Sequence, residues 1–360
     1  MIRRLVSYIF LLSLFTMVFP AHADNLPKLY LYNWNNYISQ DVVSQFEKEC
    51  KCHVVQDYYS DNEEMLAKIA SGAAGYDLIV PTGNAVESLI KQKELLPFDY
   101  SQLPNFHNIK PEFRGMWFDA KNQFSIPYAY TITLLGYNVE KMKALGIPTN
   151  TWAAIFEPKY LEKIKGKVTV LDSQRELMSA AMRYLGYSIN DTDPEKWKRA
   201  RNVILKAKPY WAAFNAGSYA KELSVGNIWL AHGYSGDMFT AQMEVAAKKP
   251  EAFHIEYSTP KEGAVLAVDN MVIHRTSKNP ELAHRFVNFM LEGKNSAELT
   301  NLIGVGNPNT NAMRYIKPNL ANNRTIFPAA TELANLEMLK DLDRHHRRLL
   351  NRYWIQIKVN

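Results

Sequence analysis

Cysteine is scarce in this sequence: Cys50 and Cys52 are the only two among 360 residues. Their Cys-x-Cys spacing allows a disulfide in an oxidising compartment. With His53 they would supply three metal ligands, one fewer than a tetrahedral site needs, and no second half occurs elsewhere. We therefore interpret them as a structural bend between a helix and a strand, and expect no metal and no cofactor.

Long hydrophobic runs are missing after the first residues. Positions 1–23 combine two arginines, an apolar stretch over 5–19 and a small-residue site at 21–23, the pattern of a cleaved secretory signal peptide. No cysteine stands at the cleavage point, which excludes lipid attachment there. No later run is long enough to span a bilayer. These features predict an exported, soluble protein of the periplasm.

Charge of one sign is modest. The formal net charge is +6, and loss of Arg3 and Arg4 with the leader leaves +4. The basic excess gathers at 344–348, which we interpret as a solvated helix face, with a docking patch for an anionic membrane or receptor as the alternative. No basic platform interleaved with aromatic residues is present, so we expect no nucleic-acid partner.

Catalytic motifs are also absent. The stretch His232-Gly233-Tyr234-Ser235-Gly236-Asp237 follows an apolar run, but it departs from the G-x-S-x-G nucleophile elbow at Asp237. No nucleophile–base pair, metal motif or phosphate-binding loop stands out. We therefore do not expect an enzyme.

What is present is an alternation of strands and helices, in a chain with 47% hydrophobic and 22% charged residues. The first half predicts β-α-β-α-β-α, a doubly wound lobe. Its expected strands cover 29–32, 53–59 and 76–81, and its helices follow Ser39-Gln40-Asp41, Asp61-Asn62 and Thr82-Gly83-Asn84.

A second α/β series follows two extended connections. The connections are expected at 124–128 and 134–137, the strands at 167–171, 227–231, 254–257 and 264–274, and the helices near 174–186, 194–207, 235–247 and 283–290. Several chain crossings indicate two hinged lobes, one from 24–132 plus 268–315 and the other from 133–267 plus 316–360.

Two aromatic residues follow the first strand, where ligands bind in open α/β sheets. Trp34 and Tyr37, with the Asn35 amide between them, are able to hold an organic cation between aromatic faces. The alternative is that both rings are core or lid packing.

Three carboxylates are the candidate anions. Ser173-x-x-Glu176 fits a capping box, so Glu176 either returns to the helix cap or faces a cleft. Asp237 is either a helix cap or a second pocket carboxylate. Asp269 interrupts an apolar strand, and because a buried carboxylate is costly unless paired, it is either a site residue or half of an internal ion pair.

Several motifs occur together and in order: Tyr32-Asn33-Trp34-x-x-Tyr37, 76–81, Arg175-Glu176, 260–263 and Asn307-Pro308-Asn309. With them the chain from about 27 to 357 resembles the bacterial periplasmic spermidine- and putrescine-binding proteins. The resemblance implies a type II periplasmic binding protein fold, with two α/β lobes that close around a polyamine.

The resemblance also implies roles for individual residues. Trp34 and Tyr37 would be aromatic walls, Thr82 a hydroxyl contact, Glu176 an acceptor for a terminal amine and Asp269 the central acceptor. Tyr234 stands where the family has a stacking tryptophan, Asp237 matches a carboxylate of the putrescine-type pocket, and Asn84 lies where the spermidine binder has a tyrosine.

Other positions depart from the family pattern: Ser173 replaces an aspartate, and Ala267 and Val305 replace aromatic residues. The altered pocket favours a monomeric receptor for a triamine, such as norspermidine or spermidine, that reports to an inner-membrane signalling protein. The alternative is the substrate-binding component of a polyamine ABC permease, and a periplasmic enzyme is a remote third. We expect a triamine to be preferred to putrescine, because three carboxylates are able to meet three ammonium groups.

The Trp34→Ala substitution should reduce polyamine affinity more than Tyr234→Phe does. The first change removes a whole aromatic face, whereas the second keeps the ring and removes a hydroxyl. Dissociation constants of both variants, measured by calorimetry, check this order. A larger loss in Tyr234→Phe would assign Trp34 to packing.

Overall fold

The computed structural model describes residues 26–248 and 251–359. The signal-peptide prediction therefore lies outside the described residues. Within them, no helix combines the length and the apolar character that a membrane crossing needs.

One mixed sheet runs through the molecule, with strand order β2-β1-β3-β10-β5-β8-β6-β7 and with β4, β9 and β11 paired beside this path. The strands are β1 (Lys28–Trp34), β2 (His53–Tyr59), β3 (Leu78–Ile79), β4 (Leu95–Leu96), β5 (Ile126–Asn138), β6 (Val168–Val170), β7 (Ala213–Phe214), β8 (Leu230–Tyr234), β9 (Ile255–Ser258), β10 (Ala264–His274) and β11 (Leu336–Glu337).

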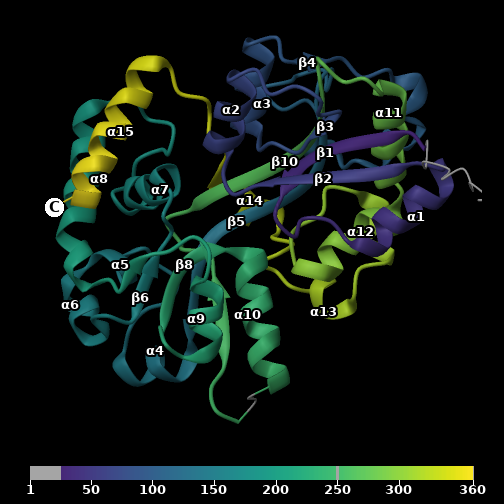
Figure 1. The fold of residues 1–360 in the computed structure, drawn as a ribbon. Coiled ribbons are helices and arrows are strands. Elements are labelled where there is room, and N and C mark those ends of the chain that lie inside the picture. The colour runs from purple at the N-terminus through teal and green to yellow at the C-terminus, as the bar shows by residue number, and fades with distance from the viewer. Residues whose placement is uncertain (1–25, 249–250, 360) are drawn as a thin grey trace, which may run out of the picture.

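The helices lie around this sheet in two groups (Figure 1). One group contains α1 (Gln40–Cys50), α2 (Asn62–Ala70), α3 (Gly83–Lys91), α11 (Pro280–Met290), α12 (Gly293–Ile303) and α13 (Pro318–Ala321). The other contains α4 (Val139–Leu145), α5 (Ala153–Phe156), α6 (Pro158–Leu161), α7 (Gln174–Tyr184), α8 (Pro194–Ala207), α9 (Tyr219–Val225), α10 (Ser235–Lys248) and α15 (Arg344–Val359). The short α14 (Ala330–Leu333) follows α13 and precedes α15 in sequence, and it lies between the two groups in space.

Two long strands connect the two groups. β5 and β10 pair antiparallel from Ile126 to Ile132, and Figure 1 shows them running from one group of helices to the other. Beyond this pairing β10 bonds to β3 and β4 on one side, while β5 bonds to β8 and β9 on the other. We propose to divide the lobes where these strands cross, at 132/133 and 267/268.

Several expected elements differ from the observed ones. The two extended connections are a single strand, β5, because its long pairing with β10 keeps the backbone extended between them. The strand expected at 227–231 lies at Leu230–Tyr234, since His232 and Gly233 pair with β5. The strand expected at 76–81 keeps only Leu78 and Ile79.

The interpretation of Cys50 and Cys52 as a bend is confirmed. α1 ends at Cys50, Lys51 adopts a left-handed φ of 52°, and β2 begins at His53. The two cysteines form a disulfide across this turn. No group of side chains suited to hold a metal ion is found among the described residues.

The basic run at 344–348 opens α15, whose buried residues are Leu349, Leu350, Tyr353 and Ile357. Its arginines Arg344, Arg347 and Arg348 are exposed on the opposite face. The prediction of a solvated helix face is confirmed.

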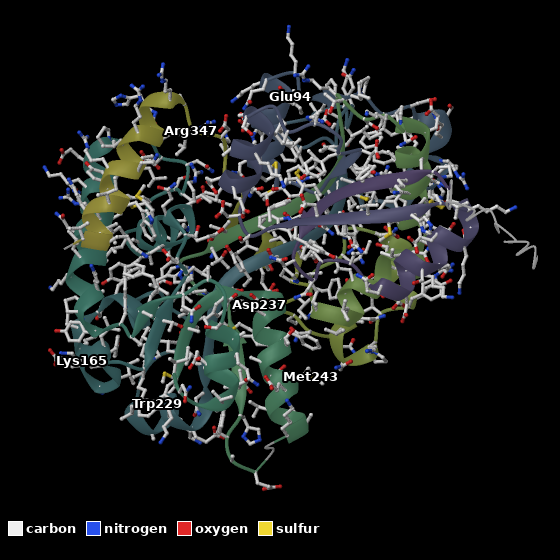
Figure 2. The ribbon with its side chains drawn as sticks, in the orientation of Figure 1. Glu94, Lys165, Trp229, Asp237, Met243 and Arg347 are labelled. Atoms are coloured by element: carbon white, nitrogen blue, oxygen red, sulfur yellow. A yellow bond between two sulfur atoms is a disulfide. The ribbon has the colours of Figure 1, made fainter. Side chains whose placement is uncertain are left out.

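A charged cluster ties the chain before α15 to the other lobe. The Asp341 carboxylate accepts from Lys91 of α3 at 3.3 Å and also from Arg347, while its backbone N–H donates to Glu87 of α3 at 2.9 Å. The Asp341 side chain is only 12% exposed. Figure 2 shows Arg347 at the end of α15 that faces α2 and α3.

We expect Asp341→Asn to lower the free energy of unfolding by about 1.5–3 kcal/mol, the usual worth of a hydrogen bond to a charged group. The change leaves Lys91 and Arg347 without the anion between them. Urea unfolding measures this loss. Glu195→Gln is the control, because this carboxylate is 68% exposed and its pair with Lys198 should contribute little. Equal effects in the two variants would contradict a stabilising role for the cluster.

Candidate functional site

Asp269 lies at the middle of the junction between the lobes. Its neighbours in β10, Val268 and Asn270, are buried, and the side chain itself is 5% exposed. The pairing of β10 with β5 shifts at this point: Asp269 faces Ala129 and Asn270 faces Pro127, so Tyr128 is an extra residue. Such a bulge commonly redirects a side chain beside a functional site.

Two neutral hydroxyls bind the Asp269 carboxylate. Thr82 Oγ1 donates to Oδ1 at 2.6 Å, and Tyr37 Oη donates to Oδ2 at 2.7 Å. No described Lys or Arg pairs with it, so the alternative of an internal ion pair is not what the structure contains. Burial raises the pKa of Asp269 to about 6, and the two hydroxyls oppose that rise.

The Thr82 side chain does not cap its helix, because its hydroxyl donates to Asp269 instead. It occupies the N-cap position of α3, where a threonine hydroxyl ordinarily accepts from the first turn. Here its side chain makes no capping hydrogen bond. The hydroxyl is committed to Asp269 instead, so the sequence Thr82-Gly83 both begins a helix and holds the buried carboxylate.

The loop after β1 is fixed from several sides. Asn33 Oδ1 accepts from the Trp34 N–H at 2.9 Å, Asn36 turns the chain with a left-handed φ of 55°, and the Tyr128 hydroxyl donates to the Tyr37 carbonyl at 2.9 Å. These contacts place the Tyr37 hydroxyl at Asp269. The Trp34-x-x-Tyr37 loop is therefore held by hydrogen bonds as one wall of the site.

Trp34 is oriented by the end of β3. Its indole Nε1 and the Tyr59 hydroxyl both donate to the Val80 carbonyl, at 2.8 and 2.6 Å, and the two rings pack with centroids 4.5 Å apart. Trp34 remains partly exposed while Tyr59 is buried. The Trp34 ring thus has one face packed and part of its surface accessible.

Glu176 reaches the site from the second lobe. It lies in the first turn of α7, and Ser173 Oγ accepts from its N–H at 3.5 Å. Its carboxylate does not return to the cap: Oε2 accepts from the Thr133 hydroxyl of β5 at 2.7 Å. Only half of the expected capping box is therefore formed. Burial raises the pKa of Glu176 to about 7 despite the Thr133 hydrogen bond.

Asp237 occupies the first turn of α10, and Figure 2 shows it at the end of this helix that faces the other lobe. The Tyr219 hydroxyl donates to its carboxylate and also accepts from the Tyr234 N–H at 3.1 Å. Asp237 keeps contact with solvent, yet desolvation by the surrounding protein raises its pKa.

Tyr234 brings the acids of both lobes together. Desolvation raises its pKa well above the ordinary value, and the negative charges of four carboxylates raise it further. In decreasing order of effect these are Glu176, Asp237, Glu63 and Asp269. The arrangement is therefore an aromatic ring among acids contributed by both halves of the chain.

The sequence-predicted residues are not all united here. Hydrogen bonds join Tyr37 and Thr82 to Asp269, and they join Asp237 to Tyr234 through Tyr219. Glu176 binds Thr133, which lies opposite Tyr234 in the β5–β8 pairing, and Trp34 packs on Tyr59. Asp269 is related to the second lobe's acids by its charge, which acts on Tyr234 together with theirs. Asn35 is exposed and Asn84 is partly buried, and no described contact connects either of them to the group.

Sequence reasoning missed five residues of the site. The local sequence around each of them predicts a strand or a helix but no site residue. The five are Tyr59, Glu63, Tyr128, Thr133 and Tyr219. The one available signal was Glu63, which follows the Asp61 cap of α2 and is polar without a capping duty. Arg175, quoted only as part of a motif, lies near Glu63 and Glu176, and their charges act on its guanidinium.

A two-lobed sheet with acids and aromatic side chains at the junction is the architecture of the type II periplasmic binding protein fold predicted from the sequence. A family model described as bacterial extracellular solute-binding protein matches residues 41–328. The chain belongs to this family.

Proteins of known sequence agree. A putrescine/cadaverine-binding protein of Pseudomonas aeruginosa is 53% identical over 94% of this chain and 96% of its own length. A putrescine-binding periplasmic protein of Escherichia coli is 32% identical over 92% and 91%, and a spermidine/putrescine-binding periplasmic protein of the same species is 34% identical over 89% of each chain. The predicted relationship to this group is confirmed.

Solved structures lead to the same fold. The spermidine/putrescine ABC transporter substrate-binding protein of Streptococcus pneumoniae superposes with a TM-score of 0.78 and 27% identity, covering 92% of this chain and 98% of the other. A lipoprotein of Treponema pallidum gives a TM-score of 0.80 and 28% identity, covering 92% and 99%.

The raised pKa values predict that affinity for an organic dication increases with pH. At pH 5 Glu176 and Asp269, with pKa values of about 7 and about 6, keep their protons and offer no charge. At pH 8 both are ionised, while alkylammonium groups stay charged, as lysine does. We expect at least tenfold weaker binding at pH 5 than at pH 8.

Stability of the ligand-free protein should show the opposite trend. The folded state binds these protons more tightly than the unfolded chain, so their contribution is fully present below the ordinary values of 4.5 and 3.8 and is lost as the pH rises through about 6 and about 7. The increase in melting temperature caused by the ligand should therefore be larger at pH 8. A larger increase at pH 5 would contradict this assignment.

Proposed function

We propose that this chain is a periplasmic receptor for a short linear diamine, such as putrescine or cadaverine, and that it delivers the diamine to an ABC permease. The observation that carries the proposal is Asp269, a buried carboxylate held by two neutral hydroxyls with no described cation beside it, whose charge acts on Tyr234 together with those of Glu176 and Asp237 from the other lobe. Ammonium groups separated by methylenes need carboxylates at separate points and apolar surface between them.

Each part of the site has a role in this proposal. Asp269, with Thr82 and Tyr37 holding its two oxygens, receives one ammonium group. Glu176 or Asp237 receives the other from the opposite lobe, so a bound diamine links the lobes. Trp34 and Tyr234 offer aromatic surface to the methylenes and to the cations.

The attraction between the acids of the two lobes and the ligand's ammonium groups would close the lobes around the ligand. Acids of both lobes repel one another when ionised, and burial adds a desolvation cost to each. An ammonium group between them removes the repulsion and supplies the hydrogen-bond donors that a buried carboxylate needs. Binding and closure are then one event, because only the closed form brings both acids to the same ligand.

Two arguments bear on the length of the ligand: the number of acids in the site, and the ligands that the similar proteins are described as binding. The triamine preference expected from the sequence rests on three carboxylates, Glu176, Asp237 and Asp269, that are able to meet three ammonium groups. The relative with 53% identity is described as binding putrescine and cadaverine, and two further relatives as binding putrescine. We give the ligands of these similar proteins more weight than the number of acids in the site. The triamine preference expected from the sequence is the alternative, and the titration below decides between the two.

The membrane partner is proposed on the same basis. The S. pneumoniae protein is described as the substrate-binding protein of an ABC transporter, which supports delivery to a permease. The signalling role also stays a prediction, based on the small residues Ala267 and Val305 where the family has aromatic ones. Uptake of labelled putrescine in cells lacking this gene separates the roles: delivery requires uptake to fall, whereas sensing leaves uptake intact.

Calorimetry with putrescine, cadaverine, norspermidine, spermidine and neutral 1,4-butanediol tests the ligand. We expect no heat from the diol and at least tenfold tighter binding of the two diamines than of the triamines. Asp269→Asn should weaken diamine binding by tenfold or more, equivalent to about 1.4 kcal/mol. Glu281→Gln, an exposed carboxylate at the start of α11, is the matched control.

Three results would count against the proposal. Binding of the diol as tightly as putrescine would exclude recognition by charge. Tighter binding of norspermidine or spermidine would establish the triamine preference instead. An amine that is not recovered unchanged would indicate an enzyme.

A further inference from the structure

The helix α15 lies at the outer edge of the second lobe, beside α8 (Figure 1). The Arg201 guanidinium of α8 donates to Gln356 of α15 at 2.7 Å, which fixes the two helices side by side. Between Arg344 and Val359 the helix contains five arginines and lysines and no aspartate or glutamate. Its buried face packs on the lobe, so the opposite face is the one that a partner would meet.

Three arginines follow one another along this exposed face. Arg344, Arg348 and Arg352 are spaced by four residues, so they lie one above the other on the helix surface. All three are exposed, and none has a hydrogen-bond or ion-pair partner in the described part of the chain. Their charge is therefore available to an anion outside the molecule.

The acids that contact α15 do not neutralise these arginines, because each is paired with another group. Asp341 belongs to the charged cluster described above. Asp343 Oδ2 lies 2.8 Å from His346 Nδ1, and Asp172 Oδ1 accepts from Lys358 Nζ at 2.7 Å. The exposed face of α15 thus keeps a positive charge.

Two aliphatic side chains share this face with the arginines. Ile355 is 62% exposed and Val359 is 79% exposed. At 3.6 residues per turn, these two side chains and the three arginines lie within about 80° of one another around the helix axis. We call these five residues the outer stripe of α15. It combines cations with exposed hydrocarbon on one narrow strip of surface.

We propose that the outer stripe of α15 binds the surface of an anionic phospholipid bilayer. A phospholipid supplies both complements of the stripe. Its phosphate accepts paired N–H bonds from a guanidinium, and the hydrocarbon below the headgroup receives exposed aliphatic side chains such as Ile355 and Val359. An acidic protein surface would satisfy the arginines alone and would leave the aliphatic side chains without a complement.

The inference goes beyond the proposed function and does not depend on the ligand of the cleft. In the free protein the stripe is solvated, and the proposal concerns what it binds. Binding is weak and reversible, because each arginine near an anionic membrane strengthens it only about fivefold. The stripe would thereby concentrate an exported receptor beside the bilayer without anchoring it there.

Sedimentation with lipid vesicles tests the proposal on the mature protein purified from the periplasm. We expect binding to phosphatidylcholine vesicles that contain phosphatidylglycerol, little binding to phosphatidylcholine alone, and weaker binding as salt is added. The double variant Arg348→Gln, Arg352→Gln should bind the anionic vesicles at least tenfold more weakly. The matched control is Arg314→Gln, Arg324→Gln, which removes two exposed arginines on either side of α13 and should change binding less than twofold.

A second double variant tests the aliphatic part of the stripe. Ile355→Gln with Val359→Gln keeps every charge and should weaken binding to the anionic vesicles at least threefold. Leu302→Gln is its control, because this leucine of α12 is also 52% exposed, and binding should change less than 1.5-fold. All the substituted side chains are exposed, and melting temperatures together with putrescine affinity verify that each variant keeps the fold and the cleft.

Four results would overturn the proposal. The first is equal binding to neutral and anionic vesicles, or binding to neither. The second is an unchanged affinity in Arg348→Gln, Arg352→Gln, and the third is an equal loss in this variant and its arginine control. The fourth is a loss in the arginine variant with none in Ile355→Gln, Val359→Gln, which would assign the stripe to an acidic protein partner. Failure to bind putrescine counts against the proposed function alone.

Discussion

The molecule depends on one costly arrangement, a carboxylate in the middle of an apolar strand. Asp269 would destabilise β10 if its oxygens were left alone, because a buried charge requires donors. Thr82 and Tyr37 supply them from two different loops, and neither is charged. The carboxylate is thereby held in place without being neutralised, which leaves its charge available to a ligand.

Much of the first lobe is arranged around this requirement. The bulge at Tyr128 sets the register at which Asp269 lies, and the Tyr128 hydroxyl also holds the Tyr37 loop. Thr82 leaves the start of α3 without a side-chain cap. The lobe therefore gives up some local stability, on the scale of about 1 kcal/mol for a cap, to organise one anion.

The second lobe also holds its acids with neutral hydroxyl groups, but on different helices and strands. Glu176 and Asp237 both stand in the first turn of a helix, where the helix dipole favours an anion, and each receives one hydroxyl, from Thr133 or Tyr219. Desolvation by the surrounding protein nevertheless dominates and raises both pKa values, although Asp237 keeps contact with solvent. Since β5 and β10 pass through both lobes, they connect the two sets of acids mechanically, and the Asp341 cluster adds a charged contact between α3 and α15.

The sequence by itself determined the local elements and the kind of chemistry. The sequence placed β2 at 53–59, α8 at 194–207 and β10 at 264–274 with the observed bounds. α8 buries one regular face, and β10 is buried along nearly its whole length, so both have a strong local pattern. An aspartate inside an apolar strand marked Asp269 as an anchor. Only tertiary structure decided that 126–138 forms one strand, since the long pairing with β10 is non-local. It also decided that Thr133, Tyr219 and Glu63 join the site, since a single hydroxyl or carboxylate carries no local sign of its partner.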